Sequence, residues 1–289
     1  MNKLNNIVTI GNEIKKSYGS GIYITNGEKL TLRDLLYGLM LRSGNDAALA
    51  ISTYVSGSED KFVIEMNKKA KQIGMKNTEF NNSSGLDQEK GNYSTAYDMA
   101  ILMSYAMKLD EFKKITKTKV YKLKTNKNTY RWTNKNKLLN KYKYTTGGKT
   151  GFTEKARRTL VTTATKGMTN LVVVTLNDGN DWQDHINLFE YGFDNYETYK
   201  IFKKGVLNIY DKKYYSDYNL YIKNNFYYPL TQNESKNIKI KYNLNKRGNP
   251  KKEIGNAIIY LGDKKIGEEK IYAKKKKTNS IKEWFKNDK

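Results

Sequence analysis

The segment Lys149-Thr150-Gly151 combines three residue types that can act together on one ligand. A lysine ammonium, a threonine hydroxyl and a backbone without a side chain, placed at the start of a strand, can hold a substrate carboxylate laid along the strand edge. A lysine-rich chain can contain this tripeptide by chance. Gly147-Gly148 before it and a predicted β-hairpin after it strengthen the prediction of a binding site.

A second polar triplet, Ser43-Gly44-Asn45, separates two apolar segments of helical spacing. Its hydroxyl and its amide could relay a proton and hold a substrate amide. The alternative is an ordinary turn between two helices, in which Ser, Gly and Asn are the expected residues. Taken alone, the triplet is more typical of the turn.

Hydrophobic spacing predicts the elements that hold these two triplets. Thr31 and Ser94 are suitable N-caps for the first and fourth helices, and Gly74 is a suitable C-terminal glycine for the third. Ser43 is therefore predicted to lie between two buried helices, and Lys149 at the start of a sheet strand. The predicted helices cover residues 32–41, 46–55, 59–73, 95–107 and 181–193, and the predicted strands cover residues 120–123, 130–132, 158–164 and 170–176.

The composition changes near Thr198, after which Tyr-rich short segments follow one another without a long helix. Regularly spaced strands with turns predict a small all-β domain. We therefore expect a first domain over residues 1–198, a β-rich domain over 199–273 and a basic tail over 274–289. The predicted strands of the second domain cover residues 206–210, 218–222, 238–244 and 257–261.

The types of residue present exclude several kinds of site. The 289-residue chain has no cysteine, which excludes disulfides, thiolate metal ligands and a cysteine nucleophile. His185 is its only histidine, so a His-based zinc site or a Ser-His-Asp triad would have to be built around that residue. We expect neither a metal nor an organic cofactor.

The net charge of +24, from 53 Lys and Arg against 29 Asp and Glu, raises the question of a polyanionic partner. The basic residues are mostly lysines spread along the chain beside abundant Asn and Tyr, as an AT-biased coding sequence would produce. No known nucleic-acid-binding motif accompanies them, so we expect no nucleic-acid partner. Nucleic-acid binding stays an alternative, which predicts a steep loss of affinity with salt. An anionic cell wall or lipid surface fits the charge equally well.

Several longer blocks of the sequence resemble one enzyme family. They are residues 30–48, Gly85-Leu86-Asp87, residues 93–100 and residues 149–153. In this order they closely resemble the serine-type D-alanyl-D-alanine carboxypeptidases, the low-molecular-weight penicillin-binding proteins. The resemblance implies an α+β fold of the penicillin-binding and β-lactamase type, which is an antiparallel sheet flanked by helices. A helical subdomain would carry Ser43, and a small all-β domain would follow.

The resemblance also implies a reaction. In that family a serine of an S-x-x-K motif attacks the D-Ala-D-Ala bond of peptidoglycan stem peptides and forms an acyl-enzyme, and β-lactams bind the same site. Carried over by position, Ser43 would help to pass a proton to the leaving amine. Asn45 would bind the substrate's amide.

The K-T-G motif of the family binds the terminal carboxylate of the substrate. The resemblance therefore implies this role for Lys149 and Thr150, with Gly151 in the same motif. The backbone N–H of Phe152 would be one of two oxyanion-hole donors. The other donor would be the N–H of the nucleophilic serine. The chemistry of the family uses no histidine, so the resemblance implies that His185 is a packing or hydrogen-bonding residue.

That nucleophile has no counterpart in the expected place. The only S-x-x-K in the chain is Ser58-Glu59-Asp60-Lys61, which follows Ser43 instead of preceding it and begins a polar helix turn. In the family the motif precedes the stretch that matches residues 7–12. We therefore expect an N-terminally truncated family member that lacks the nucleophile and is inactive alone. The alternative is a non-catalytic remnant that still binds peptidoglycan through Lys149.

The two ends of the chain bear on where the protein works. Residues 1–6 lack the apolar core of a signal peptide, and no apolar stretch reaches the roughly 18 residues that span a bilayer. The resemblance implies the extracytoplasmic cell envelope for an intact family member. The segment from Lys274 to Phe285 resembles the start of a membrane-surface anchor helix, and an exposed tail is the alternative.

Overall fold

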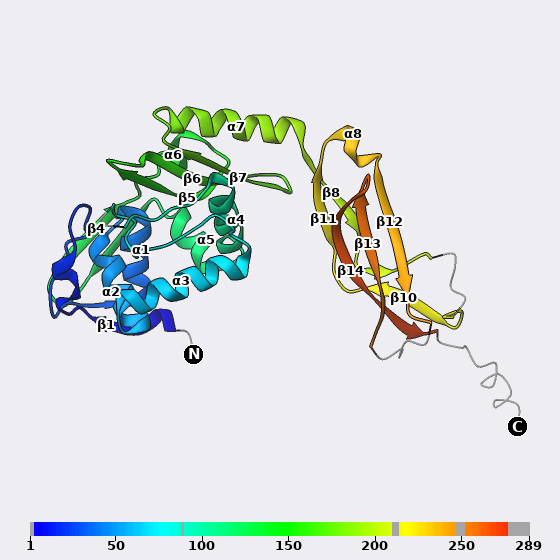
Figure 1. The fold of residues 1–289 in the computed structure, drawn as a ribbon, viewed down its shortest axis with the longest axis horizontal. Helices are drawn as coiled ribbons and strands as arrows, with labels where there is room; N and C mark the ends of the chain where they lie inside the picture. The colour runs from blue at the N-terminus through cyan, green and yellow to red at the C-terminus, as the bar shows by residue number, and fades with distance from the viewer. Residues whose placement is uncertain (1–2, 88–89, 210–213, 247–251, 277–289) are drawn as a thin grey trace, which may run out of the picture. The chain divides into compact units, whose positions relative to one another are not determined.

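The chain folds as two units, shown in Figure 1 in a computed structural model that describes residues 3–87, 90–209, 214–246 and 252–276. The units are Met1–Phe193 and Asp194–Lys289. Buried apolar residues form separate clusters within each of them. Strand β8 (Glu197–Phe202) runs across residue 198, where the sequence suggested a domain boundary.

The longer helices of the first unit begin and end close to where caps and apolar spacing predict. The Thr31 side chain accepts the N–H of Asp34, whose carboxylate accepts the N–H of Thr31 in return. The cap of α4 is Thr95 and not the predicted Ser94, whose hydroxyl bonds with Thr78 instead. The helices are α1 (Leu32–Arg42), α2 (Asn45–Ser56), α3 (Glu59–Ile73), α4 (Ala96–Ala106), α5 (Asp110–Lys117), α6 (Leu138–Lys141) and α7 (Asp181–Asn195), with short 3₁₀ helices at Lys3–Asn5 and Asn12–Lys16.

Two helices, α5 and α6, are absent from the sequence prediction. With eight and four residues, they are too short for apolar spacing to repeat recognisably. Their positions are fixed by tertiary contacts, because Ile115 of α5 and Leu138 of α6 are buried in two different apolar clusters.

The central sheet of the first unit is antiparallel, with β5 (Thr145–Thr153), β6 (Arg157–Lys166) and β7 (Thr169–Leu176) in that order. The predicted hairpin of the last two strands is confirmed. The prediction that Lys149 begins a strand is wrong, because Gly147 and Gly148 are part of β5 instead of preceding it. At Gly148, with φ +153°, a Cβ would lie 2.5 Å from the carbonyl oxygen of Val161, so glycine permits the close approach of β6.

Helices cover both faces of this sheet. Leu160 and Val173 pack with Phe189 of α7 on one face. On the other face, Thr163 of β6 contacts Met107 at the end of α4. Successive residues of a strand point to opposite faces, which explains the two sets of contacts. The predicted α+β fold, an antiparallel sheet flanked by helices, is confirmed.

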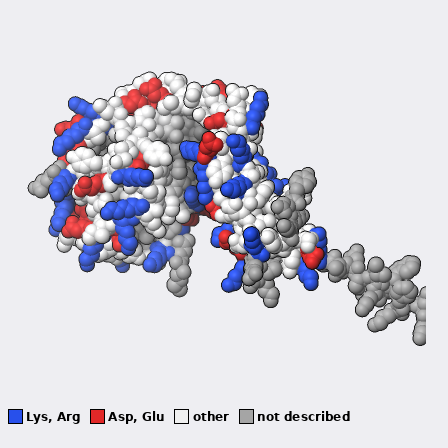
Figure 2. All heavy atoms as spheres, turned by 45° about the vertical axis from the view of Figure 1, so that its right-hand side comes forward, with Lys and Arg blue, Asp and Glu red and all other residues white. Residues whose placement is uncertain are grey.

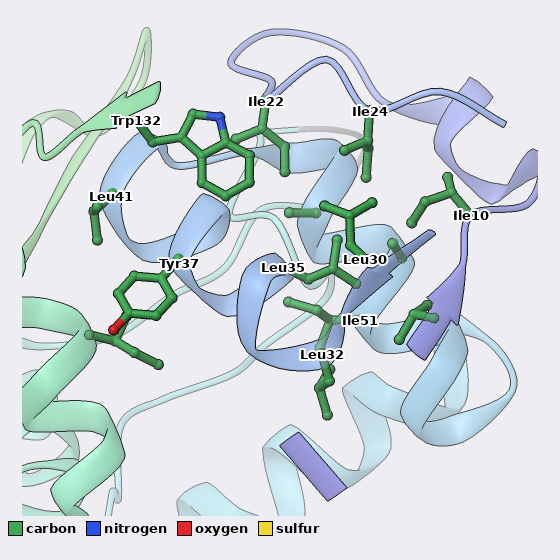
Figure 3. Close-up of a cluster of buried hydrophobic side chains, with 14 residues drawn as sticks. Ile10, Ile22, Ile24, Leu30, Leu32, Leu35, Tyr37, Leu41, Ile51 and Trp132 are labelled. Atoms are coloured by element: carbon green, nitrogen blue, oxygen red, sulfur yellow. The ribbon is translucent and has the colours of Figure 1, made fainter. Parts of the chain in front are cut away.

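The helical part of the first unit has a core of its own, drawn in Figure 3. Leu35 and Leu41 of α1 are fully buried in it. Ile22 and Trp132 lie beside each other over α1, where both come close to Gly38. Two small antiparallel sheets border this core, β1 (Ile7–Thr9) with β2 (Lys29–Thr31) and β3 (Val120–Lys124) with β4 (Thr129–Thr133).

In the described residues that follow α7, the second unit is built of strands apart from the short helix α8 (Gln232–Ser235). A five-stranded sheet and a two-stranded sheet enclose a core that includes Leu220, Ile254 and Ile259. The predicted small all-β domain is confirmed. The five-stranded sheet has the order β12 (Ile238–Leu244), β13 (Glu253–Leu261), β14 (Lys264–Lys275), β10 (Tyr218–Ile222) and β9 (Gly205–Val206), and the other sheet pairs β8 with β11 (Phe226–Leu230).

Some predictions for the second unit need correction. The strand predicted over residues 206–210 is only Gly205–Val206, and Tyr210 lies outside the described residues. Strands β8, β11 and β14 are absent from the prediction, because lysines and tyrosines obscure their alternation. Strand β14 extends into the predicted basic tail as far as Lys275. The rest of the proposed anchor segment, from residue 277 onward, lies outside the described residues.

Basic and acidic side chains are mixed on the face that Figure 2 shows. On the face shown in Figure 2, Lys and Arg are spread over both units, with Asp and Glu between them. A nucleic-acid-binding surface is more typically a continuous basic stripe. None of the helices in the described ranges is both long enough and apolar enough to cross a bilayer.

Candidate functional site

Ser43 occupies the break between α1 and α2. Its backbone is left-handed, with φ 58° and ψ 46°, and its N–H donates to the carbonyl oxygen of Leu39 at 3.0 Å. Gly44 follows as the cap of α2, packed so closely on Asp46 that a Cβ there would lie 2.8 Å from the carboxylate. The triplet therefore is a helix–helix turn. A non-glycine residue in this conformation is strained, and such residues concentrate at functional sites.

Lys149 reaches this turn from β5. Its Nζ donates to Ser43 Oγ, and it also donates to the carbonyl oxygen of Thr150 at 2.7 Å. Ser43 and Lys149 are 106 positions apart in the sequence. The fold thus brings together the two triplets that the sequence singled out, with an ammonium against a hydroxyl.

The surroundings of Lys149 disfavour its charged form. Burial, and after it the nearby charge of Lys135, lowers the pKa of Lys149 to about 8. Burial and the charge of Arg42 likewise lower the pKa of Lys135, whose Nζ donates to Ser20 Oγ at 3.3 Å. Three cationic side chains therefore lie near one another at the end of α1, an arrangement that favours an anionic ligand.

Lys135 and Ser20 are site residues that inspection of the sequence missed. Lys135 is one lysine among many, and no pattern around it differs from the rest of the chain. Ser20 lies in a segment without regular secondary structure. The only available signal was the neighbouring Asn134-Lys135-Asn136, in which short polar residues indicate an irregular backbone.

Asn45, the third residue of its triplet, is largely buried, with 7% of its surface exposed. Its backbone N–H donates to the carbonyl oxygen of Ser20 at 2.8 Å, and its Nδ2 donates to that of Tyr18 at 2.7 Å. Its Oδ1 accepts no hydrogen bond from any residue that the structure describes. The side chain is thus fixed in place with its acceptor oxygen available.

Asp46 holds the segment that carries Ser20. Its buried carboxylate accepts the backbone N–H groups of Ile22 at 3.0 Å, Tyr23 at 2.7 Å and Ile24 at 3.3 Å. A carboxylate that accepts several backbone N–H groups fixes a segment that forms no ladder of its own. In the sequence Asp46 is only the acidic residue expected in the first turn of a helix, so this role could not be predicted.

Strand β5 presents the K-T-G triplet on the edge of its sheet. Lys149, Thr150 and Gly151 pair with Val161, Leu160 and Thr159 of β6, and β5 is the outer strand of the order β5-β6-β7. Across the described residues no strand pairs with its other edge. An extended peptide can add to an edge of this kind.

The far end of β5 is open to solvent. Phe152 is 64% exposed, although its side chain is large and apolar. At the preceding position, a Cβ on Gly151 would lie 2.4 Å from Thr159 Oγ1. Glycine therefore suits the close packing of β5 on β6, and the exposed Phe152 ring is available to a ligand.

Ser58 and Lys61, the only S-x-x-K pair in the chain, have a structural role. Ser58 is the N-cap of α3, and its Oγ accepts the backbone N–H of Lys61 at 3.3 Å. The Lys61 side chain is exposed. A hydroxyl used as a helix cap with a solvated lysine one turn later is typical of a helix start.

His185, a residue of α7, is fully buried against the sheet. Its Nδ1 lies 2.6 Å from Thr162 Oγ1, and its Nε2 lies 3.1 Å from Thr175 Oγ1. Burial lowers the pKa of His185 to about 4, against the opposing effect of Asp181 and Asp178. The predicted packing and hydrogen-bonding role is confirmed.

Comparison with known families agrees with this geometry. The sequence model of the D-alanyl-D-alanine carboxypeptidases matches residues 2–180. The chain belongs to this family. The model of the penicillin-binding protein 5 C-terminal domain matches residues 196–278, within the second unit.

Individual carboxypeptidases are similar over different lengths. D-alanyl-D-alanine carboxypeptidase DacF of Bacillus subtilis is 37% identical over 190 residues, which cover 64% of this chain and 49% of that protein. The DacD carboxypeptidase of Salmonella typhimurium is 30% identical over 282 residues, covering 91% of this chain and 71% of that protein. The chain thus spans about half the length of the Bacillus carboxypeptidase.

Solved structures of penicillin-binding proteins have a similar fold. Penicillin-binding protein 5 from Haemophilus influenzae superposes with a TM-score of 0.75 at 27% identity, covering 94% of this chain and 83% of that one. Penicillin-binding protein 6B from Escherichia coli gives a TM-score of 0.68 at 27% identity, covering 92% and 79% of the two chains.

Proposed function

We propose that this chain carries the substrate-recognition half of a D-Ala-D-Ala carboxypeptidase site that acts on peptidoglycan stem peptides in the cell envelope. The observation that supports the proposal is the hydrogen bond from Lys149 to Ser43, which joins the K-T-G and S-G-N triplets of a family member. In the reaction, a serine oxygen bonds to the amide carbon, the C–N bond breaks and D-alanine leaves with a proton. Water then hydrolyses the ester.

The terminal carboxylate of the substrate binds at the cationic end of the site. Lys149 and the nearby Lys135 supply two ammonium groups, and Thr150 supplies a hydroxyl from the same strand edge. Charge-assisted hydrogen bonds to a carboxylate are stronger than neutral ones. The carboxylate also relieves the repulsion between the two lysines, so binding of an anion there is favourable.

Ser43 and Asn45 act on the scissile amide. Lys149, with a pKa of about 8, can supply a proton through the Ser43 hydroxyl to the leaving nitrogen. The free Oδ1 of Asn45 accepts an N–H of the substrate. The backbone N–H of Phe152 donates to the oxyanion that develops at the attacked carbonyl.

Acylation of the 289-residue chain itself is not expected. Its one S-x-x-K serine, Ser58, caps α3 through its hydroxyl. Incubation of the purified chain with a fluorescent penicillin, followed by denaturing electrophoresis, should therefore give no labelled band. A covalent adduct mapped to Ser58 or to any other residue would overturn this part of the proposal.

Substrate recognition is tested separately by non-covalent binding. A stem peptide ending in D-Ala-D-Ala should bind saturably, and Lys149→Ala should weaken binding about tenfold or more, because a charged hydrogen-bond partner is lost. Lys61→Ala removes a lysine from the exposed S-x-x-K pair and should leave the affinity unchanged. Equal affinity of the Lys149→Ala variant and the parent chain would contradict the proposed role of the K-T-G triplet.

A second function is favoured by the helix-capping role of Ser58. In this alternative the protein is a non-catalytic peptidoglycan-binding module that holds peptide carboxylates through Lys149. The two functions predict different results of penicillin labelling for the protein isolated from its native cells. Labelling of that protein by penicillin supports the carboxypeptidase, whereas saturable peptide binding without labelling supports the module.

A further inference from the structure

Strand β4 has an unpaired edge. The N–H of Asn134 donates to the carbonyl oxygen of Lys119, and that of Thr125 donates to the carbonyl oxygen of Asn128. These two pairs are the hydrogen-bonded ends of the β3–β4 ladder. Between them, opposed residues alternate between hydrogen-bonded and non-hydrogen-bonded pairs, and Thr129 and Arg131 belong to non-hydrogen-bonded pairs. Thr129 and Arg131 therefore direct their backbone N–H and C=O groups away from β3.

No described residue hydrogen-bonds the backbone of Thr129 or Arg131 on that side. The next outward-facing group, the carbonyl oxygen of Thr133, accepts from the guanidinium of Arg42 at 3.3 Å. An unpaired strand edge is a template for another strand. About five residues of strand, roughly 16 Å at 3.3 Å per residue, are presented here.

This edge forms one wall of a groove of about 370 Å³, and the segment Gly21-Ile22-Tyr23 forms the other. The second wall is held firmly, because the buried Asp46 carboxylate accepts the N–H of Tyr23 at 2.7 Å and that of Ile22 at 3.0 Å. Trp132 and Ile22, which lie side by side in Figure 3, also line the groove.

Tyr23 has a conformation that its surroundings impose. Its φ is +62°, in the left-handed region, and its side chain is 79% exposed. A strained backbone held from both sides is characteristic of ligand clamps. The exposed Tyr23 ring lies beside the groove and is available for contact with a ligand. Packing within the described part of the protein does not explain its position.

Two guanidinium groups also line the groove. Arg42 contacts the carbonyl oxygen of Thr133, and Arg131 contacts the hydroxyl of the same residue at 3.4 Å. Neither arginine forms an ion pair with a carboxylate of a described residue. Arginine recognises carboxylates through paired N–H donors, so this pair is suited to an acidic ligand.

We propose that the groove binds an extended peptide bearing carboxylates, which adds to β4 as a further strand. The unpaired N–H and C=O groups of Thr129 and Arg131 require a backbone with both donors and acceptors, which a lipid headgroup or a phosphate does not offer. Arg42 and Arg131 select peptides with acidic side chains. Tyr23 contacts the bound strand from the opposite wall.

The groove adjoins the carboxypeptidase site and shares Arg42 with its cationic end. Arg42 lines the groove and lowers the pKa of Lys135, which in turn contributes to lowering that of Lys149. A bound acidic peptide would therefore lie next to the pocket for the substrate's terminal carboxylate. The proposal rests on the edge of β4, on Arg131 of that strand and on Arg42 of α1, so it does not depend on the proposed reaction.

The first test is the binding of acetyl-Ala-Glu-Ala-Glu-Ala-amide to the 289-residue chain at low salt, measured by calorimetry. The peptide should bind saturably. Its Gln counterpart should bind at least about tenfold more weakly, because the charge-assisted hydrogen bonds are lost. Arg42→Gln and Arg131→Gln should each weaken binding of the Glu peptide to a similar degree. Lys149→Ala should leave this binding intact, which separates the groove from the carboxypeptidase site.

The matched control is Lys122→Gln. Lys122 lies directly opposite Arg131 in the ladder, on β3, and carries the same charge. Its loss should leave the affinity nearly unchanged. Equal affinity for the Glu and Gln peptides, or equal effects of Lys122→Gln and Arg131→Gln, would show that only general charge attraction is at work and would overturn the proposal.

The second test is amide hydrogen exchange with and without the Glu peptide. The N–H groups of Thr129 and Arg131 should exchange quickly in the free chain and slowly in the complex, because each gains an acceptor. The N–H of Lys122 faces the opposite edge of the ladder and should be unaffected. Unchanged exchange at Thr129 and Arg131 in the saturated complex would exclude strand addition.

Discussion

At the scale of single residues, Lys149 is the side chain on which the proposed function depends most. Its Nζ is in contact with Ser43, and burial together with Lys135 holds its pKa at about 8. A lysine near neutral pKa can both bind a carboxylate and exchange a proton. Its protonation therefore affects binding and stability in different ways.

Binding of a D-Ala-D-Ala peptide should weaken as pH rises through about 8, because Lys149 then loses its charge. Stability should change in the opposite direction. The pKa is lower in the folded chain than its ordinary value of 10.5, so the unfolded chain binds more protons between about 8 and 10.5. The free energy of unfolding should therefore rise with pH across that window, as measured by urea denaturation.

The control for both measurements is Lys149→Met, which cannot titrate. Subtracting its pH profile from that of the parent chain isolates the contribution of Lys149 from those of the other lysines. Parallel stability profiles of the two proteins between pH 8 and 10.5 would mean that the pKa of Lys149 is not lowered in the folded state.

At the scale of elements, β5 is positioned by tight contacts of its glycines with β6 and α5. Gly148 lies against the carbonyl oxygen of Val161, and Gly147 lies against Thr116 of α5. The neighbour of Gly148 is backbone, and that of Gly147 is a threonine hydroxyl that donates to the carbonyl oxygen of Phe112 in its own helix at 3.0 Å. These contacts fix the register of β5 and, with it, the position of Lys149 relative to Ser43.

Gly148→Ala should therefore destabilise the chain by about 3 kcal/mol, from steric overlap with β6 and from the unfavourable φ of +153°. Gly167→Ala is the matched control, because its φ is +61° but no atom lies within 4 Å of a Cβ there. It should cost about 1 kcal/mol. Chemical denaturation measures both changes, and equal losses would show that the packing against β6 is unimportant.

At the scale of the whole molecule, the two units have separate hydrophobic cores. Leu35 is fully buried in the first unit, and Leu220 is fully buried in the second. Replacement of a buried leucine by alanine costs about 2–5 kcal/mol in the core that loses it. The site residues Ser43 and Lys149 both belong to the first unit.

Leu220→Ala should consequently lower the unfolding temperature of the second unit while leaving the affinity for a D-Ala-D-Ala peptide unchanged. Leu35→Ala, of the same size change, should destabilise the first unit and weaken peptide binding near its unfolding temperature. Calorimetry resolves the two transitions. A single transition that shifts equally in both variants would show that the units unfold together.

The sequence by itself determined most of the helices, the hairpin of β6 and β7, the all-β character of the second unit and the family. Apolar spacing, caps and turn residues act over a few positions, so they can be recognised in the sequence without the fold. Short elements such as α5, and lysine-rich strands such as β14, could not be predicted because their stability comes from distant contacts.

Only the tertiary structure decided how the site is assembled. Ser43 and Lys149 were recognisable as motifs, but Lys135, Ser20 and Asp46 gained their roles from neighbours far away in the chain. Burial and proximity to other charges lower the pKa of Lys149, and neither property exists before the chain is folded. Local preferences thus specify elements, whereas the long-range packing of those elements creates the electrostatic environment in which their side chains can react.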